Sequence, residues 1–305
     1  MNLPRISMGY NKLTRLFLVL SALFYWGCTE EVAMPEISSS SKLVVDAWIT
    51  DKGGPYQVKL TRSLPFKSLA SGVNYTYEEG LNLIGIPDAQ VTISDNTGFE
   101  EVLKKEPNNT YGYVTTNLVG KAGRTYYLKI KLKGQEYTAT AYMPPVPKID
   151  KVSYFFRPTE IVGKEDSYVP LVYFQEPTHE KNYYLFKYCY QDWCGPINGG
   201  STGGRNWNVS IMNDDLMPAY VNGLSIDDGH SVSGMDFYPF SGVNTLQMYS
   251  LTKEGYQHFD ALIRQFLNDG GTYQPAPASA PGNISNGALG FFGAAAVSEM
   301  KVHIP

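Results

Sequence analysis

Short runs of alternating apolar and polar residues constrain this chain most, because they follow one another with turn residues between them. Residues 56–62 (Tyr-Gln-Val-Lys-Leu-Thr-Arg) alternate at period two, which turns one face of a strand toward a core and the other toward water. Further strand-like runs cover residues 43–50, 89–94, 112–116, 125–132 and 137–142. Short strands with turn signals every roughly 8–12 residues predict a β-sandwich over residues 42–145.

A proline-rich break separates this region from the rest of the chain. Residues 143–147 contain three prolines, which remove strand hydrogen-bond donors and favour an extended linker. We therefore expect a domain boundary here and a second β-rich domain over residues 146–305. Its strand-like runs are residues 149–156, 168–174, 182–190, 206–212, 236–238, 245–250 and 297–304.

One helix is expected inside the second domain, over residues 252–268. Its apolar residues fall three or four positions apart, Thr252 can cap its start, and Gly270 can supply the left-handed residue that ends it. The apolar stripe is expected to pack on a sheet; the alternative is an exposed helix that fills a partner's groove. The predicted fold class is therefore all-β (mainly β), with one amphipathic α-helix.

Residues 1–27 have the three parts of a secretory signal. Arg5, Lys12 and Arg15 form a basic region without an acid, and residues 16–26 form a weakly polar to apolar run. This run is too short to cross a ~30 Å hydrocarbon core, which needs about 20 apolar residues. The segment is therefore predicted to direct export.

The signal ends at Gly27-Cys28, and a small residue before a cysteine is what a lipoprotein signal peptidase requires. We predict that Cys28 carries the lipid. The aromatic residues Tyr25 and Trp26 depart from the usual pattern at this site, so an ordinary secretory signal or an uncleaved anchor are the alternatives.

Residues 28–41 are expected to form a flexible tether, because Ser-rich and Pro-containing stretches cannot bury enough surface to fold. Within it, Glu30 and Glu31 resemble the acidic export tag of Bacteroidota lipoproteins on the outer face of the outer membrane. A randomly charged tether is the alternative. The predicted location is the outer membrane, lipid-anchored and facing outward.

Charge excludes one class of partner. Removing the signal takes away three basic residues and no acid, so the formal net charge moves from −4 to −7. Nucleic-acid binding would need a basic face, so no nucleic acid is expected as a partner.

Motifs for catalysis are weak. Residues 199–203 match G-x-S-x-G, but glycine and asparagine flank them in place of the strand and helix that hold a nucleophilic serine, so a surface loop is expected. The four histidines are scattered and are expected at the surface or at caps. Acidic pairs at residues 78–79, 214–215 and 227–228 could only form a site if the fold brought carboxylates together. We predict no catalytic residue, no metal and no cofactor.

Cys189 and Cys194 lie close enough in sequence for a strand and its returning turn to join them, and export favours oxidation, so a disulfide is predicted. A cysteine pair without a second pair or nearby histidines is a poor zinc site.

Four aromatic residues near polar loops are candidates for ligand binding, because aromatic faces beside polar loops suit sugar or peptide recognition. Core packing is the alternative for each. They are Trp193, Trp207, Tyr238 and Phe240.

Several segments together resemble one known family. They are residues 43–50 leading into 55–62, 87–93, 123–128, Glu176-Pro177 followed by Asn182-Tyr183-Tyr184, and residues 283–294 (NISNGALGFFGA). The set is similar to the Bacteroidota outer-membrane lipoprotein family called domain of unknown function forty-two forty-nine. The resemblance implies an immunoglobulin- or transthyretin-like sandwich before a second β-rich domain. It also implies a TonB-dependent receptor as neighbour, and it carries no established activity.

Two functions remain from the sequence. The first is a non-enzymatic surface lipoprotein, an accessory ligand-binding partner of a TonB-dependent receptor in nutrient uptake. The second is a secreted hydrolase that acts on glycans or peptides through dispersed carboxylates.

Overall fold

A computed structural model describes residues 41–63, 85–107, 111–158, 167–190, 197, 209–226, 230–231, 242–267 and 279–304. Strands dominate this part of the chain and one helix accompanies them, which confirms the predicted all-β class. No helix among these residues is long and apolar enough to cross a membrane. The predicted signal and the tether up to residue 40 lie outside the described residues.

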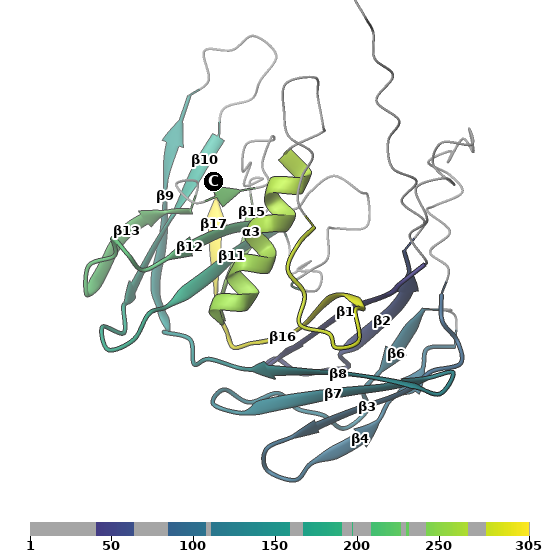
Figure 1. Ribbon diagram of the computed structural model, residues 1–305. Helices are drawn as coiled ribbons and strands as arrows, with labels where there is room; N and C mark the ends of the chain where they lie inside the picture. Colours follow the sequence, from purple (N-terminus) through teal and green to yellow (C-terminus); the bar gives the residue numbers. More distant parts are fainter. Residues whose placement is uncertain are drawn as a thin grey trace, which may run out of the picture. The chain divides into compact units, whose positions relative to one another are not determined.

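The first sandwich consists of two facing sheets around one core (Figure 1). Its strands are β1 Leu43–Thr50, β2 Gln57–Arg62, β3 Gln90–Asp95, β4 Glu100–Val102, β5 Lys104–Lys105, β6 Gly112–Val114, β7 Thr125–Leu132, β8 Gln135–Tyr142 and β16 Leu289–Ala295. One sheet has the order β16-β1-β2-β6-β5 and the other β4-β3-β7-β8. Alternation is clearest in β7, where Tyr126, Leu128 and Ile130 are buried between exposed neighbours. Strands β7 and β8 form a hairpin whose tight turn is Lys133-Gly134, and both residues have positive φ.

The second sandwich follows the proline-rich break. Its strands are β9 Ile149–Arg157, β10 Ser167–Gln175, β11 Tyr183–Tyr190, β12 Val209–Asn213, β13 Tyr220–Ser225, β14 His230–Ser231, β15 Gly242–Leu251 and β17 Val297–Ile304. A sheet of order β14-β12-β11-β15-β17 packs against a sheet of order β13-β10-β9. Alternate residues of β11, Tyr184, Phe186 and Tyr188, enter the core between the two sheets, while Leu185 lies on the other face. The expected strand at residues 236–238 lies outside the described residues.

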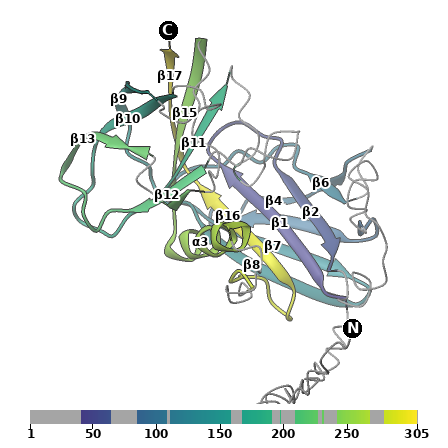
Figure 2. The same cartoon turned by 90° about the horizontal axis from the view of Figure 1, so that it is seen from above.

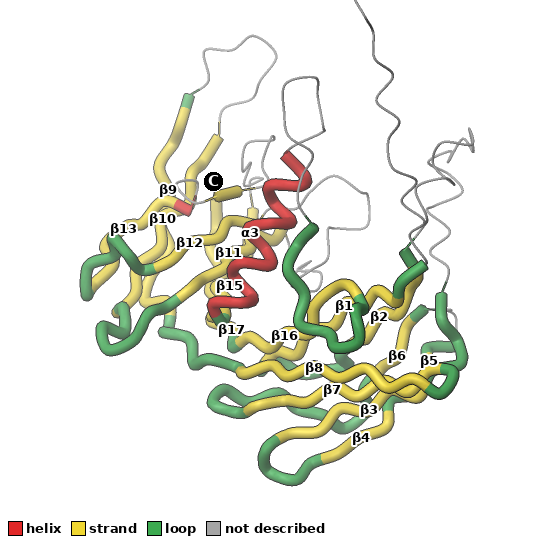
Figure 3. Tube along the Cα trace, viewed as in Figure 1, coloured by secondary structure: helices red, strands yellow, loops and turns green. Residues whose placement is uncertain are grey.

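The helix α3, Lys253–Leu267, covers that other face of the five-stranded sheet (Figure 3). Thr252 caps its start as predicted, because its hydroxyl accepts a hydrogen bond from the Gly255 amide at 3.2 Å. Phe259 and Ile263 are buried against the sheet, so the expected packing of the stripe is confirmed. The expectation of a surface position is wrong for His258. It is buried, and its ring stacks on Phe291 with 4.6 Å between centroids.

Strand β16 crosses the division expected at residue 145. It pairs in parallel with β1, with Phe292 opposite Ala47 and Gly293 opposite Trp48 (Figure 2). Its side chains alternate between the two cores: Phe292 enters the first core, and Phe291 packs in the core under α3. The last part of the predicted second domain therefore completes the first sandwich, because β1 would otherwise leave its edge unpaired.

Candidate functional site

Most residues predicted for binding or modification lie outside the described residues. These are Cys28, Glu30, Glu31, Trp193, Cys194, Trp207, Tyr238 and Phe240. Cys189 lies in β11 and is disulfide-bonded, while its pairing with Cys194 stays a prediction.

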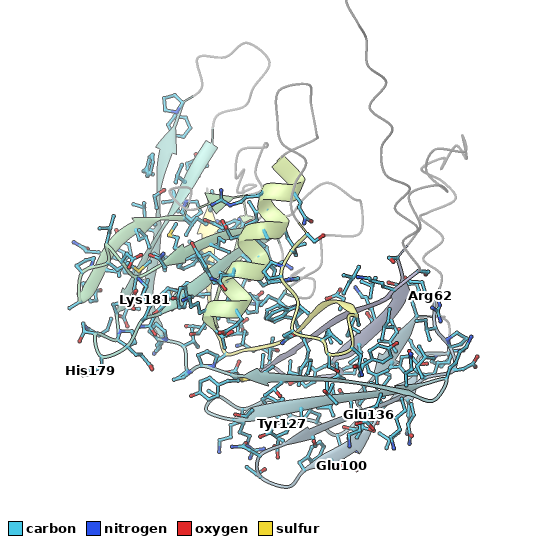
Figure 4. The ribbon with its side chains drawn as sticks, in the orientation of Figure 1. Arg62, Glu100, Tyr127, Glu136, His179 and Lys181 are labelled. Carbon is cyan, nitrogen blue, oxygen red and sulfur yellow. The ribbon has the colours of Figure 1, made fainter. Side chains whose placement is uncertain are left out.

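A group of ionisable residues lines a shallow hollow of about 490 Å³ beside the turns that connect β10 to β11 and β12 to β13. Glu176, Lys181, Asp214 and Asp215 line it, together with His179. His179 and Lys181 lie at this end of the second sandwich in Figure 4. The fold thus brings one of the acidic pairs noted in the sequence, Asp214-Asp215, close to a glutamate from another turn.

The pKa values of two carboxyl groups in this hollow, the buried Glu176 and the half-buried Asp214, are shifted in opposite directions. Burial raises the pKa of Glu176, although hydrogen bonds from Tyr184 and Asn182 act against the rise. Burial would also raise the pKa of Asp214, but hydrogen bonds from Lys181 and from the Asn182 amide outweigh it and lower that pKa. A carboxyl whose pKa is raised beside one whose pKa is lowered is the arrangement that acid–base catalysis uses.

The same contacts also have a structural purpose. The Glu176 carboxylate accepts hydrogen bonds from the Tyr184 hydroxyl and from Asn182 Nδ2, each at 3.0 Å. Asn182 Nδ2 also donates to the carbonyl oxygens of Pro177 and Glu180, at 2.9 and 3.0 Å. This network holds the β10–β11 turn closed, so the carboxylates are already engaged in stabilising the fold. Among the described residues, no group of three or more His, Cys, Asp or Glu could hold a metal ion.

A second feature is the aromatic end of the β9–β10 hairpin. Tyr168 lies opposite Phe156 in the strand register, and its ring centroid is 5.3 Å from those of both Phe156 and Tyr154. Phe156 is 50% exposed even though the register places it on the same face as Val172, which is buried in the core. Phe155, on the opposite face, is 42% exposed. This end of the hairpin therefore presents aromatic rings to solvent on both faces.

Three buried hydroxyl groups of the same sandwich have no hydrogen-bond partner among the described residues, Tyr188 Oη, Ser210 Oγ and Ser225 Oγ. Burial and the nearby Tyr154 both raise the pKa of Tyr188, so its hydroxyl stays protonated and can donate. An unpaired buried hydroxyl costs about 1–3 kcal/mol. Such a group favours a site for water or for a polar ligand atom.

The comparison with known families matches this chain over residues 29–301 to a model described as Domain of unknown function (DUF4249). The chain belongs to that family. No curated protein matches it.

Two segments that carried the resemblance to DUF4249 are explained by the fold. Glu176, Asn182 and Tyr184 form the hydrogen-bond network described above. In the closing segment, Asn283 bonds to both the amide and the carbonyl of Phe292, at 2.9 and 2.8 Å, and its Nδ2 also donates to the Thr140 carbonyl oxygen at 3.2 Å. These bonds join β8 to β16, and thereby connect the two sheets of the first sandwich.

Sequence reasoning missed the β9–β10 aromatic group. Tyr154, Phe155 and Phe156 are consecutive in sequence, and this run inside a predicted strand was the available signal, because alternation leaves no place for three successive rings in one core. The approach of Glu176 to Asp214 had no such signal, since it depends on how β10, β11 and β12 are arranged.

Proposed function

We propose that the protein is a non-enzymatic lipoprotein of the outer-membrane surface that binds a glycan and retains it for a TonB-dependent receptor. Residues 1–31 support export, lipidation of Cys28 and outward placement. The resemblance stated above supports the receptor. The ligand-binding part rests on one observation, the exposed ring of Phe156 beside the half-buried ring of Tyr168, above a sandwich that contains unpaired hydroxyls.

Neutral glycans suit this surface. Aromatic faces pack against the apolar faces of sugar rings, and hydroxyl groups can both donate to and accept from sugar hydroxyls. Binding is expected to weaken at least about tenfold when Phe156 is replaced by serine, as expected when a buried aromatic anchor is lost. Phe155→Ser is the matched control, because it removes a ring of comparable exposure, 42% against 50%, from the opposite face of the same strand.

The receptor is tested by affinity purification of the tagged, lipidated protein from its native outer membrane. A co-purified receptor barrel is expected. Failure to recover one, under conditions that keep known lipoprotein–receptor pairs intact, contradicts the partnership. The ligand is tested on an array of neutral glycans. Absence of any signal, or equal loss with Phe155→Ser and Phe156→Ser, contradicts the proposed binding surface.

A hydrolase is the second candidate, because the pKa values of Glu176 and Asp214 are shifted in opposite directions beside an open hollow. Glycosidase and peptidase assays on the purified protein, with Asp215→Asn as a neighbouring control, test it. Activity that disappears in Asp214→Asn and persists in Asp215→Asn would establish the hydrolase and contradict the proposal of a non-enzymatic protein.

A further inference from the structure

A groove of about 310 Å³ lies where the chain enters the first sandwich. It is bounded by the start of β1, the end of β2, the β7–β8 turn and the loop before β16. Its lining includes Ser41, Lys42, Arg62, Lys133, Tyr137 and Asn286. Figure 4 places Arg62 at this end of the sandwich, beside the first described residues.

The groove carries three cations from three different segments, Lys42, Arg62 and Lys133, and no carboxylate lines it. None of these side chains forms an ion pair within the described part of the chain. Lys42 and Lys133 are exposed, and Arg62 is half-buried. An unpaired basic group of this kind stands out in a chain whose formal net charge is −4.

Hydrogen bonds fix the point at which the chain enters. The Ser63 amide donates to the Lys42 carbonyl oxygen, and the Lys42 amide donates to Ser63 Oγ, both at 2.9 Å. Ser41 Oγ donates to the Ser63 carbonyl oxygen at 2.9 Å. The basic groove therefore has a fixed place at the root of the predicted tether.

The length of that tether limits how far the groove can lie from the proposed lipid anchor. Twelve residues separate Cys28 from Ser41. Even fully extended, they span at most about 45 Å. If Cys28 is lipidated, the groove is the part of the described body that is joined most directly to the membrane surface.

From this we infer that the groove binds phosphate groups of anionic membrane lipids and turns this end of the first sandwich toward the bilayer. The inference rests on the proposed lipid anchor. Lysine and arginine both bind phosphate oxygens well, and basic residues beside an anionic surface each strengthen attachment about fivefold.

The test uses the mature chain with Cys28→Ala, so that attachment cannot come from lipid. Co-sedimentation is measured with vesicles of phosphatidylcholine alone and of phosphatidylcholine with phosphatidylglycerol. The variant is Lys42→Gln/Arg62→Gln/Lys133→Gln. The control is Lys104→Gln/Lys129→Gln/Lys131→Gln, which makes the same charge change at exposed lysines elsewhere on the first sandwich. Thermal unfolding verifies that both variants fold.

We expect the parent chain and the control to bind the anionic vesicles, and the groove variant to bind at least about tenfold more weakly. Added salt should weaken the binding, because it screens exposed charges. Equal binding by the groove variant and the parent chain, or no preference of the parent chain for anionic vesicles, overturns the inference. Mass spectrometry of the native amino terminus tests lipidation of Cys28 separately. A wrong prediction of the lipid anchor can therefore be distinguished from a wrong inference about phosphate binding by the groove.

Discussion

Adding one methyl group at Gly293 should destabilise the protein, because the ring of Trp48 occupies the space that the methyl would need. A Cβ atom at this position would lie 2.3 Å from Cζ3 of Trp48 and 2.4 Å from Cε3. Ordinary contacts between carbon atoms are about 3.5–4.0 Å, so the ring and the backbone would have to separate by more than about 1 Å. Trp48 has little freedom to move, since Phe259 and Phe291 lie 5.0 and 5.5 Å away between centroids.

The magnitude follows from two opposing effects. Overpacking a filled core costs about 1–3 kcal/mol, and a confined indole ring places Gly293→Ala near the upper end. Removing a glycine stabilises the folded chain by about 0.4–1 kcal/mol through the unfolded state. The expected net loss is about 2 kcal/mol, or a fall in Tm of roughly 4–8 °C. Gly53→Ala is the control, because a Cβ there would meet no atom within 4 Å.

A double-mutant cycle measured by urea unfolding tests the contact itself. Trp48→Ala should cost about 3–5 kcal/mol. In that background the methyl at position 293 enters the vacated space, so Gly293→Ala should cost almost nothing and the coupling energy should be about 2 kcal/mol. If Gly293→Ala is equally destabilising with and without the indole, the two residues do not touch and the β1–β16 register is wrong.

Three further outcomes are expected. Asn283→Ala removes the three hydrogen bonds by which the Asn283 side chain links β8 to β16, and it should lower the free energy of unfolding by about 2–3 kcal/mol in urea titrations; an unchanged midpoint would contradict their role. Burial alone would raise the pKa of Glu101, but hydrogen bonds from residues 116–118 outweigh it and lower the pKa below its usual 4.5. The ionised Glu101 therefore stabilises the folded state above about pH 4.5, and this stabilisation is lost as the pH falls through the lowered pKa. Glu101→Gln should cost about 2 kcal/mol near pH 7 and much less near pH 3. A cost independent of pH would refute this. Peptide mapping without reduction should recover Cys189 linked to Cys194, and two free thiols would rule the pairing out.

Local patterns in the sequence were sufficient to predict most strands and the helix. The alternation in residues 125–132 and the three-to-four spacing after Thr252 each report one buried face, and the folded elements have the same bounds within a residue. Strand β16 was not predicted. Its sequence, Leu-Gly-Phe-Phe-Gly-Ala-Ala, is buried on both faces and has no alternation, and its partner β1 lies about 245 residues earlier. Periodicity identifies a buried face but carries no information about the strand beside it.

The candidate sites show the same difference between residues that are neighbours in sequence and residues that only the fold brings together. Adjacent residues such as Asp214-Asp215 could be noted from sequence, whereas Glu176 joins them only after β10, β11 and β12 have taken their places. The basic groove had no local signal, because Lys42, Arg62 and Lys133 meet only when three separate segments converge. The net charge of the whole chain is negative and therefore gives no indication of this basic groove.

Strand β16 also determines when the first sandwich can complete its folding. The core of the first sandwich contains Ile284, Phe292 and Ala294, which follow β1 by more than about 230 residues. A nascent chain that has already made β1 to β8 must wait, with the edge of β1 open, until the residues of β16 have also emerged. An open edge of this kind invites pairing with other chains. A chaperone that shields β1 during synthesis would therefore matter more for this protein than for one whose first domain closes by itself.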